Sequence, residues 1–397
     1  MHLDDDGLEL RTELIRLPVG NTIWQSEKRS DVRDGVELQK GIVEAVLDAI
    51  LPTARANTIA THSPRIEVGE CQDAYELYLR GKQANSRSRR IELLREVVRI
   101  DENCAVAWEA IAVNSVDWTV EGFAIAGDAA RRALDLNDSL AEAWAVLAEI
   151  AEEKGRWGES EEYFLRALYV DPTNTHANMM YGEALMARGR VREALRYSLE
   201  AYRYEPADSS TNWHVALKAI YAGEGELAIK HALNYKDLHI NPVYDGWGEL
   251  AEGCLAAGDP DQAIAIYLEH TDVVPEWYSR CILARDDVAL REGLPDILAS
   301  VASSVASGEL SPEADDAFSA IRCATWIEEI DIVFDLLTEE NYPTEKTWFL
   351  FFLPDATVLR QDPRFRQRVV ESGLLDYWRK WGWSDYCRPD GESLICD

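Results

Sequence analysis

Apolar and small residues recur along the middle of the chain with a period of about 34 residues. Copies of the pattern begin at Gln72, Ala105, Ala141, Thr175, Ser209 and Tyr244, at spacings of 33, 36, 34, 34 and 35 residues. Within a copy the large apolar residues lie three and four positions apart, which is typical of one face of an α-helix. Glycines midway through most copies indicate a chain reversal. Each copy is therefore predicted to be a helical hairpin.

Small residues occupy three positions of the hairpin at which helices must approach closely. In the copy that begins at Ala141 they are Ala148, Ser160 and Ala167. A single hairpin cannot bury its own apolar face, so neighbouring hairpins must stack. The period and the small positions resemble the tetratricopeptide repeat. This resemblance implies an all-α fold, a right-handed α-solenoid of six hairpins over residues 72–275.

The pattern before the repeats is different. Residues 8–16 alternate apolar and polar positions, as a half-buried strand does, and residues 22–26 read as the returning strand. Residues 36–51 follow as an amphipathic helix. We predict a partial α/β segment, a β-hairpin plus a helix, over residues 1–55, followed by a linker at 56–71.

Beyond residue 275 the repeat register decays, although helical spacing continues. Helical segments are predicted near residues 277–291, 294–306, 312–325 and 327–338. The last fifty residues are rich in aromatic side chains. We predict that residues 276–397 form degenerate helical repeats and an aromatic C-terminal cap that seals the open end of the stack.

Three stretches together resemble the TolB-like and repeat region of bacterial CadC-type transcription regulators and of proteins associated with class III adenylate cyclases. They are residues 8–26 with the helix that begins near Leu38, residues 74–81, and the tail segments 362–365, 373–379 and 382–389. The resemblance implies the sensory or interaction part of a bacterial regulatory system. Neither the DNA-binding nor the cyclase output domain is present in the sequence, so their activities are not carried over. In an alternative interpretation, the chain is a fragment or relative of such a regulator, with its output domain upstream.

The charge of the chain limits its partners. With 72 acidic and 40 basic residues the net charge is −32, which disfavours binding to nucleic acid or to an anionic membrane. The charge either serves solubility or favours a basic partner. No apolar run is long enough for a transmembrane helix, and the acidic N-terminus lacks the features of a signal peptide. We predict no membrane insertion and a cytoplasmic location, or a periplasmic one if an upstream anchor is missing.

The seven cysteines contain no C-x-x-C pair, so no zinc site is predicted. Cys104, Cys254, Cys281 and Cys323 lie in apolar helical patterns and are predicted to be buried small residues. Cys387 and Cys396 flank a loop that contains Pro and Gly. Their spacing permits a disulfide, the alternative being two free thiols in a frayed tail.

The chain also lacks the common signatures of catalysis. It contains no Gly-rich phosphate loop, no G-x-S-x-G and no H-E-x-x-H. Its histidines are dispersed, and its acidic pairs suit solvated helix faces. We predict a non-enzymatic protein without cofactor or metal.

Partners of tetratricopeptide stacks commonly lie on the concave face, which is lined by fixed positions of each first helix. The repeat register assigns to this groove Glu109, Asp117, Glu142, Glu149, Glu152, Glu153, His176, Met179, Glu183, Met186, Trp213, Leu217 and Tyr221. The groove is acidic in the third repeat and apolar in the fifth, which favours a protein or peptide with basic and apolar residues. Two alternatives stay open. The chain's own C-terminal helices could cover this surface, or Met179, Met186, Trp213 and Tyr221 could line a pocket for a small molecule.

The N-terminal hairpin suggests a second kind of contact. An isolated two-stranded sheet is marginally stable, and an unpaired strand edge invites pairing with another chain. Self-association through residues 8–26 is therefore predicted.

Overall fold

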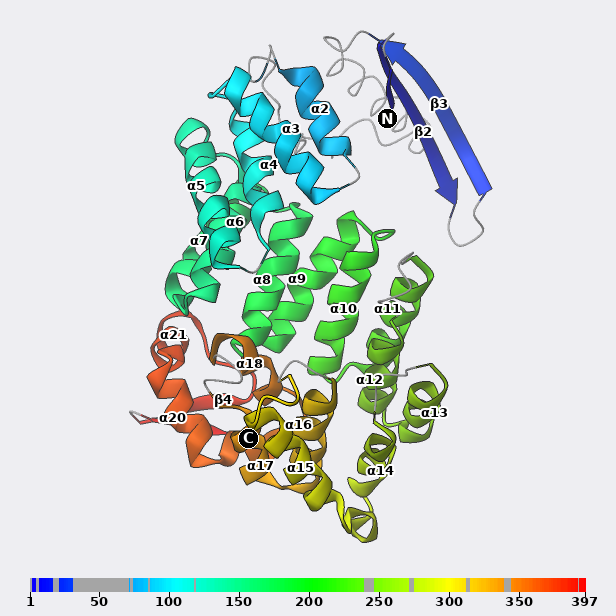
Figure 1. The fold of residues 1–397 in the computed structure, drawn as a ribbon, viewed down its shortest axis with the longest axis vertical. Coiled ribbons are helices and arrows are strands. Elements are labelled where there is room, and N and C mark those ends of the chain that lie inside the picture. Colours follow the sequence, from blue (N-terminus) through cyan, green and yellow to red (C-terminus); the bar gives the residue numbers. More distant parts are fainter. Residues whose placement is uncertain are drawn as a thin grey trace. The chain divides into compact units, whose positions relative to one another are not determined.

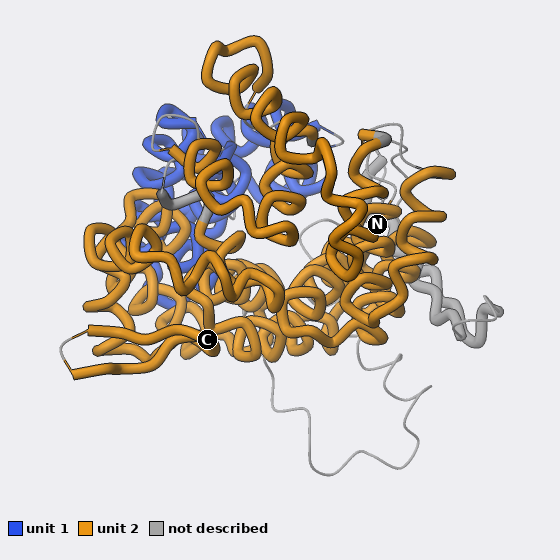
Figure 2. Tube along the Cα trace, turned by 90° about the horizontal axis from the view of Figure 1, so that it is seen from below, with its two compact units in different colours: residues 1–147 blue, residues 148–397 orange. Residues whose placement is uncertain are grey.

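The computed structural model describes most of the chain outside residues 31–70. The described residues are 2–4, 7–16, 21–30, 71, 74–84, 86–117, 119–238, 246–270, 275–311, 315–338, 344–391 and 393–397. The chain divides into two compact units, which we call unit 1 (residues 1–147) and unit 2 (residues 148–397) (Figure 2). The predicted helix at 36–51 and nearly all of the predicted linker lie outside the described residues.

The predicted hairpins are present as six consecutive pairs of helices among the described residues (Figure 1). The pairs are α2 (Tyr75–Gln83) and α3 (Arg87–Ile100), α4 (Ala105–Ser115) and α5 (Val120–Leu136), α6 (Ala141–Glu153) and α7 (Trp157–Val170), α8 (Thr175–Ala187) and α9 (Val191–Tyr204), α10 (Ser209–Tyr221) and α11 (Gly225–Leu238), and α12 (Trp247–Ala257) and α13 (Pro260–His270). Four first helices, α4, α6, α8 and α10, begin at the residue that the repeat pattern predicts. This confirms the all-α helical-repeat fold.

Local chemistry explains where these helices begin and end. Asn174 and Asp208 are N-caps of α8 and α10, and each side chain accepts a hydrogen bond from the backbone N–H three residues later, at 2.8 and 2.9 Å. Gly155, Gly189 and Gly223 stand between paired helices with φ of 63°, 74° and 73°. This left-handed conformation suits glycine, so the predicted chain reversals fall where the sequence supplies it.

The small residues lie where helices cross. Ala148, Ser160 and Ala167 are fully buried. In the next repeat, a Cβ added to Gly182 would lie 3.0 Å from Ser198 Oγ, on the facing helix α9. A larger residue at these positions would push the paired helices apart.

The N-terminal segment is a three-stranded antiparallel sheet in the order β1-β2-β3. Its strands are β1 (His2–Asp4), β2 (Gly7–Arg16) and β3 (Asn21–Ser30). In the register of the hairpin, Leu8 is opposite Ser30 and Leu14 is opposite Trp24. The two predicted strands are confirmed, whereas β1 was missed because three residues are too short to show a periodic pattern.

Helices continue after the repeats, as predicted. The elements are α14 (Glu276–Ala284), the 3-10 helix η2 (Val288–Arg291), α15 (Leu294–Ala306), α16 (Asp315–Ile327), α17 (Ile330–Leu336), α18 (Thr344–Phe351), α19 (Thr357–Gln361), α20 (Pro363–Glu371) and α21 (Leu374–Trp381), followed by the antiparallel strands β4 (Cys387–Asp390) and β5 (Ser393–Cys396). We call residues 344–397 the tail.

The aromatic residues of the tail form one cluster. The rings of Trp348, Phe351, Phe352, Phe365 and Trp378 lie in pairs with centroids 5.1–6.3 Å apart. The prediction that this cluster seals the open end of the stack is wrong. The tail instead returns to the third, fourth and fifth repeats, where α18 contacts α8 and α21 contacts α7 (Figure 1).

Three disulfide bridges link six of the seven cysteines. They join Cys71 to Cys104, Cys281 to Cys323, and Cys387 to Cys396. The predicted burial of Cys104, Cys254, Cys281 and Cys323 is confirmed. The two bridges that involve Cys104, Cys281 and Cys323 were not predicted, because the bonded partners are distant in the sequence. Cys254 forms no disulfide.

Candidate functional site

The first helices α8, α10 and α12 form a continuous surface in residues 148–397, together with the last turn of α6. Polar contacts connect each first helix to the next. Glu149 of α6 lies 3.0 Å from His176 Nε2 of α8, Glu183 of α8 forms an ion pair with Lys218 of α10, and Trp213 Nε1 of α10 donates to Glu249 of α12 at 2.7 Å. We call this surface the first-helix face. The structure thus brings together the predicted groove residues of the third, fourth and fifth repeats.

One part of this face is open to solvent. His176, Met179, Trp213 and Leu217 are partly exposed, and the side chain of Glu183 is 41 % exposed. We call these five residues the open part of the first-helix face. It presents three apolar side chains beside a carboxylate, which is an arrangement suited to an apolar anchor with a neighbouring cation.

A buried lysine, Lys218, lies next to the open part and contacts Glu183 and His214. The Lys218 side chain has no exposed surface and pairs with Glu183, and its Nζ lies 3.0 Å from His214 Nδ1. Burial lowers the pKa of Lys218, and the carboxylate of Glu183 opposes this shift. Burial and the nearby Lys218 hold the pKa of His214 well below its ordinary value, so this imidazole is neutral at pH 7. The side chain of Glu183 therefore faces solvent, and the buried Lys218 ammonium offsets part of its charge.

The tail covers the other end of the face. Met186 and Tyr221 are buried. The hydroxyl of Tyr386 donates to the carbonyl oxygen of Tyr221 at 2.9 Å, and the ring of Phe349 lies beside that of Tyr221. The prediction that Met186 and Tyr221 line an open groove or a ligand pocket is wrong at this end, because the chain itself occupies the surface.

Hydrogen bonds join the tail to the turns of three successive repeats. Trp157 Nε1 donates to the carbonyl oxygen of Ser372, and Trp378 Nε1 donates to that of Arg188, both at 2.9 Å. The Asp385 N–H donates to the carbonyl oxygen of Gly189 at 2.8 Å, and the Tyr386 hydroxyl donates to that of Tyr221. Gly189 admits the tail closely, since a Cβ there would lie 2.6 Å from the Phe352 ring.

A buried ionic network lies under this junction. Arg188 has no exposed surface, and its guanidinium pairs with Glu152 and, at 2.9 Å, with Glu161. The Tyr377 hydroxyl of the tail donates to Glu161 at 2.7 Å and accepts from Arg190 at 2.7 Å. Burial opposes the charge of Arg188, but the carboxylates of Glu152 and Glu161 keep its pKa raised. Glu152 is thus part of this network and is not free for a partner as predicted. Glu153, the next residue of α6, is partly exposed.

Three predicted groove residues lie in residues 1–147. Glu109 accepts hydrogen bonds from the N–H groups of Glu142 and Ala143, at 3.1 and 3.3 Å. Burial, together with the charge of Glu142, raises the pKa of Glu109 to about 7. Glu142 is itself partly exposed. Asp117 is exposed and accepts from the Thr119 N–H and hydroxyl; it lies beyond the end of α4 and not on the first helix, where the register placed it.

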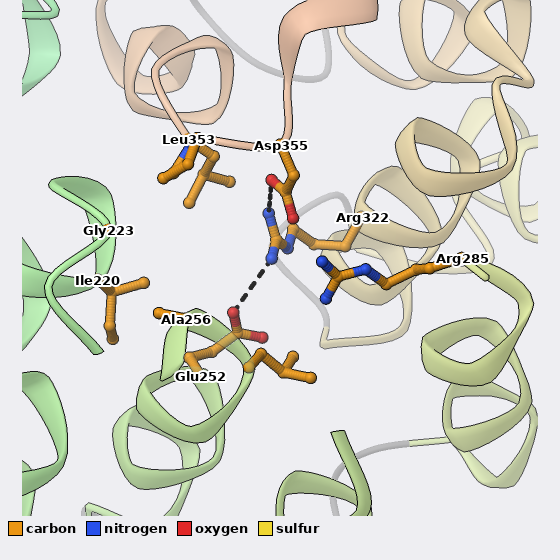
Figure 3. Close-up of a pocket in the computed structure, with 10 residues that line it drawn as sticks. Ile220, Gly223, Glu252, Ala256, Arg285, Arg322, Leu353 and Asp355 are labelled. Carbon is orange, nitrogen blue, oxygen red and sulfur yellow. Dashed lines mark hydrogen bonds and ion pairs between the residues drawn. The ribbon is translucent and has the colours of Figure 1, made fainter. Parts of the chain in front are cut away.

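A pocket that the sequence did not predict lies at the covered end of the face (Figure 3). Arg322 lies between Glu252 and Asp355 and donates to them at 3.1 and 3.0 Å. Extending the repeat register to the sixth hairpin would have assigned Glu252 to the groove. Arg322 and Asp355 follow no repeat pattern, so nothing in the sequence pointed to them. Among the described residues no cluster of side chains could hold a metal ion, and no helix is long and apolar enough to cross a membrane.

The repeats match a known type. The family model of the tetratricopeptide repeat matches residues 141–174, which contain α6 and α7. This hairpin of the chain therefore matches a tetratricopeptide repeat. No curated protein sequence matches it.

Several solved structures are similar to the chain. YrrB, described as a TPR protein with an unusual peptide-binding site, is 18% identical, and the match covers 45% of this chain and 93% of YrrB with a TM-score of 0.34. PilW, a type IV pilus biogenesis factor, is 20% identical over 51% of this chain and 93% of its own, with a TM-score of 0.39. The pilF protein of Pseudomonas aeruginosa is 18% identical, and the match covers 54% of this chain and 95% of pilF with a TM-score of 0.38. The fold assignment rests on the repeat geometry of this chain.

Proposed function

We propose that the protein is a non-enzymatic scaffold whose open part of the first-helix face binds a segment of a partner protein. The observation that carries this proposal is the partial exposure of Met179, Trp213 and Leu217 on a face that the tail covers elsewhere. Partly exposed aromatic and aliphatic side chains in a row are typical of surfaces that bury an anchor residue of a partner.

The charges around this row favour a partner segment with a basic residue beside its apolar anchor. The exposed carboxylate of Glu183 lies on α8, and Glu249 lies next to Trp213. The chain as a whole carries a net charge of −32, which speeds association with a cationic segment. The acidic contribution of the third repeat is smaller than the sequence suggested, because Glu152 is engaged by Arg188.

Selection from a library of random peptides displayed on phage tests the proposal, with the full chain as bait. The selected peptides are expected to combine an aromatic or aliphatic residue with Lys or Arg. Trp213→Ala should weaken their binding by about tenfold or more, since removing a central aromatic anchor commonly costs at least 1.4 kcal/mol. Tyr169→Ala is the matched control, because Tyr169 is 78% exposed on the second helix α7. Equal losses in both variants, or selected peptides without basic residues, would contradict the proposal.

The resemblance of the tail supports a finer proposal, that this scaffold serves a bacterial regulatory system. Reading the genomic DNA upstream of the codon for Met1 tests it. An in-frame winged-helix or cyclase domain supports this role, and an upstream stop codon next to a ribosome-binding site contradicts the version with a fused output domain.

The disulfide bridges support a periplasmic rather than a cytoplasmic location, because bridges persist in oxidising compartments. Protein isolated from its native compartment should gain the mass of six hydrogens on reduction, two for each of the three bridges. An unchanged mass would favour the cytoplasm.

The strand edges support self-association through the N-terminal sheet. Strand β1 pairs only with Gly7 to Glu9, so no described strand pairs with the rest of that edge of β2. Light scattering should show a smaller oligomer for residues 70–397 than for the full chain. The same number of protomers per particle in the two samples would reject this contact.

A further inference from the structure

The pocket at the covered end of the first-helix face has a volume of about 150 Å³. One side is apolar and the other is charged. The lining residues are Ile220, Gly223, Leu255, Ala256, Leu353 and Pro354 on the apolar side, and Glu252, Arg285, Arg322 and Asp355 on the charged side. Figure 3 shows the arginines extending into this region from the side opposite Ile220 and Gly223.

Both carboxylates of the pocket already have partners. Each accepts a hydrogen bond from Arg322, and each has a second donor on its other oxygen. The second donor is the Tyr267 hydroxyl at 2.9 Å for Glu252, and Trp326 Nε1 at 2.6 Å for Asp355. Burial opposes ionisation of Asp355, but the charges of Arg322 and Arg285 and the hydrogen bond from Trp326 together outweigh it and lower the pKa of this carboxyl group. A ligand amine would therefore compete with donors that are already in place.

The two arginines of the pocket have fewer hydrogen-bond partners than the two carboxylates. Among the described residues the Arg285 guanidinium makes no hydrogen bond or ion pair, and its central carbon lies 5.2 Å from the centre of the Trp326 ring. Arg322 is 4 % exposed, and its Nε is buried without a hydrogen-bond partner. A disulfide between Cys281 and Cys323 ties α14, which ends just before Arg285, to α16, which contains Arg322. Arg285 is partly exposed, so its guanidinium can donate to an acceptor that enters the pocket from solvent.

We propose that this pocket binds a small monocarboxylate with a compact apolar body. The carboxylate accepts hydrogen bonds from Arg285, and the body packs against Ile220, Leu255 and Leu353. The charges of Glu252 and Asp355 are offset by those of Arg322 and Arg285. A monocarboxylate therefore adds a single negative charge to a group of side chains that is neutral overall. A dianion such as phosphate would add two charges beside Glu252 and Asp355 and is disfavoured.

The size of the pocket limits the ligand. An apolar cavity of about 150 Å³ holds a molecule of the size of benzene. Two sources share the required chemistry: a free branched or aromatic acid, and the C-terminal residue of a peptide with an apolar side chain. This site does not depend on the open part of the first-helix face, so the two proposals fail separately.

Titration calorimetry of the full, oxidised chain tests the proposal with isovalerate, isovaleramide, isopentylamine and inorganic phosphate. Isovalerate is expected to bind with a Kd of about 1 mM or below, and at least tenfold more tightly than the amide, the amine or phosphate. N-acetylglycyl-leucine and its C-terminal amide identify the source. Tighter binding of this peptide acid than of isovalerate indicates a peptide terminus, and weaker binding indicates a free acid.

Three variants connect the binding to the pocket. Arg285→Gln should weaken isovalerate binding by about tenfold or more. Ala256→Leu should abolish it by filling the pocket from the apolar side. Arg366→Gln is the matched control, because Arg366 is an exposed arginine of α20 outside the pocket, and it should bind as wild type does. Equal binding of isovalerate and isovaleramide to the wild type would overturn the proposal. Unchanged affinity in both pocket variants, each with a wild-type circular dichroism spectrum, would also overturn it.

Discussion

The two ends of the first-helix face are both built from groove positions of the repeats, but one end is open to solvent and the other is buried. His176 and Met179, near the start of α8, are partly exposed. Met186, two turns later on the same helix, is buried, and α18 of the tail contacts this helix. Helix register determines which side chains lie on this face, and it does so equally at both ends. Whether such a side chain is available to a partner depends on contacts with a segment more than 150 residues away, such as the bond between Tyr386 and Tyr221 at a separation of 165.

The covered end is also the polar end. Arg188, Glu152 and Glu161 are brought together under the tail, whereas at the open end Lys218 is buried but its partner Glu183 is 41 % exposed. Buried ion pairs are costly to disrupt one partner at a time, because the remaining charge stays desolvated. The tail therefore closes on the repeats in one specific arrangement, and substitutions at the two ends should have very different effects.

The largest effect is expected from Arg188→Met, which leaves Glu152 and Glu161 without their shared cation. The free energy of unfolding of unit 2 should fall by about 3–5 kcal/mol in urea titrations followed by circular dichroism. The control is Arg156→Met, since the ion pair of Arg156 with Glu159 is largely exposed and contributes at most about 1 kcal/mol. Similar losses in the two variants would mean that the network does not stabilise the junction.

A smaller loss is expected from Ala167→Phe, at the crossing of buried helices. Ala167 has no exposed surface, so the larger side chain should overpack the crossing and cost about 1–3 kcal/mol. Leu165→Phe on the same helix is the control, because Leu165 is 39% exposed. Thermal unfolding should separate the two variants by several degrees. A fully stable Ala167→Phe protein would show that the repeat register is misassigned.

The smallest effect concerns the pH dependence of unit 1. Because the pKa of Glu109 is raised from 4.5 to about 7, the unfolded chain loses this proton at lower pH than the folded chain does. The contribution of Glu109 to stability therefore falls as pH rises from about 4.5 to 7. Glu109→Gln keeps an acceptor for the two N–H groups and should be about 1–2 kcal/mol more stable than wild type at pH 8, with no difference at pH 4. A difference that does not change with pH would contradict the raised pKa.

The repeats were predictable because their information is local. Asn174, Asp208 and the glycines at the turns specify helix ends within a few residues, and the small positions recur with every hairpin. The position of the tail was not predictable in this way. Trp157 meets Ser372 across 215 residues, and no periodic pattern connects them. For the same reason the pocket was missed, since Arg322 and Asp355 come from outside the repeats and only Glu252 follows the register.

The disulfide between Cys281 and Cys323 also could not be predicted from local sequence. Cys281 and Cys323 occur in apolar helical patterns, so the local sequence indicated two buried small residues and gave no sign of a bridge between them. Their Cα atoms lie 5.4 Å apart because α14 packs against α16, and this brings them within bonding range. Only the packing of the two helices could reveal the pair.

Methionine oxidation tests the central claim most directly, because Met179 and Met186 are the same residue type on the same helix at opposite ends of the face. Dilute hydrogen peroxide oxidises exposed methionine to the sulfoxide, and peptide mass spectrometry follows each residue separately. In the native protein Met179 should oxidise at least tenfold faster than Met186, and the two rates should become equal in urea. A peptide that binds the open part should slow the oxidation of Met179 alone. Equal native rates at Met179 and Met186 would contradict the account, because the tail would then not cover one end of the face.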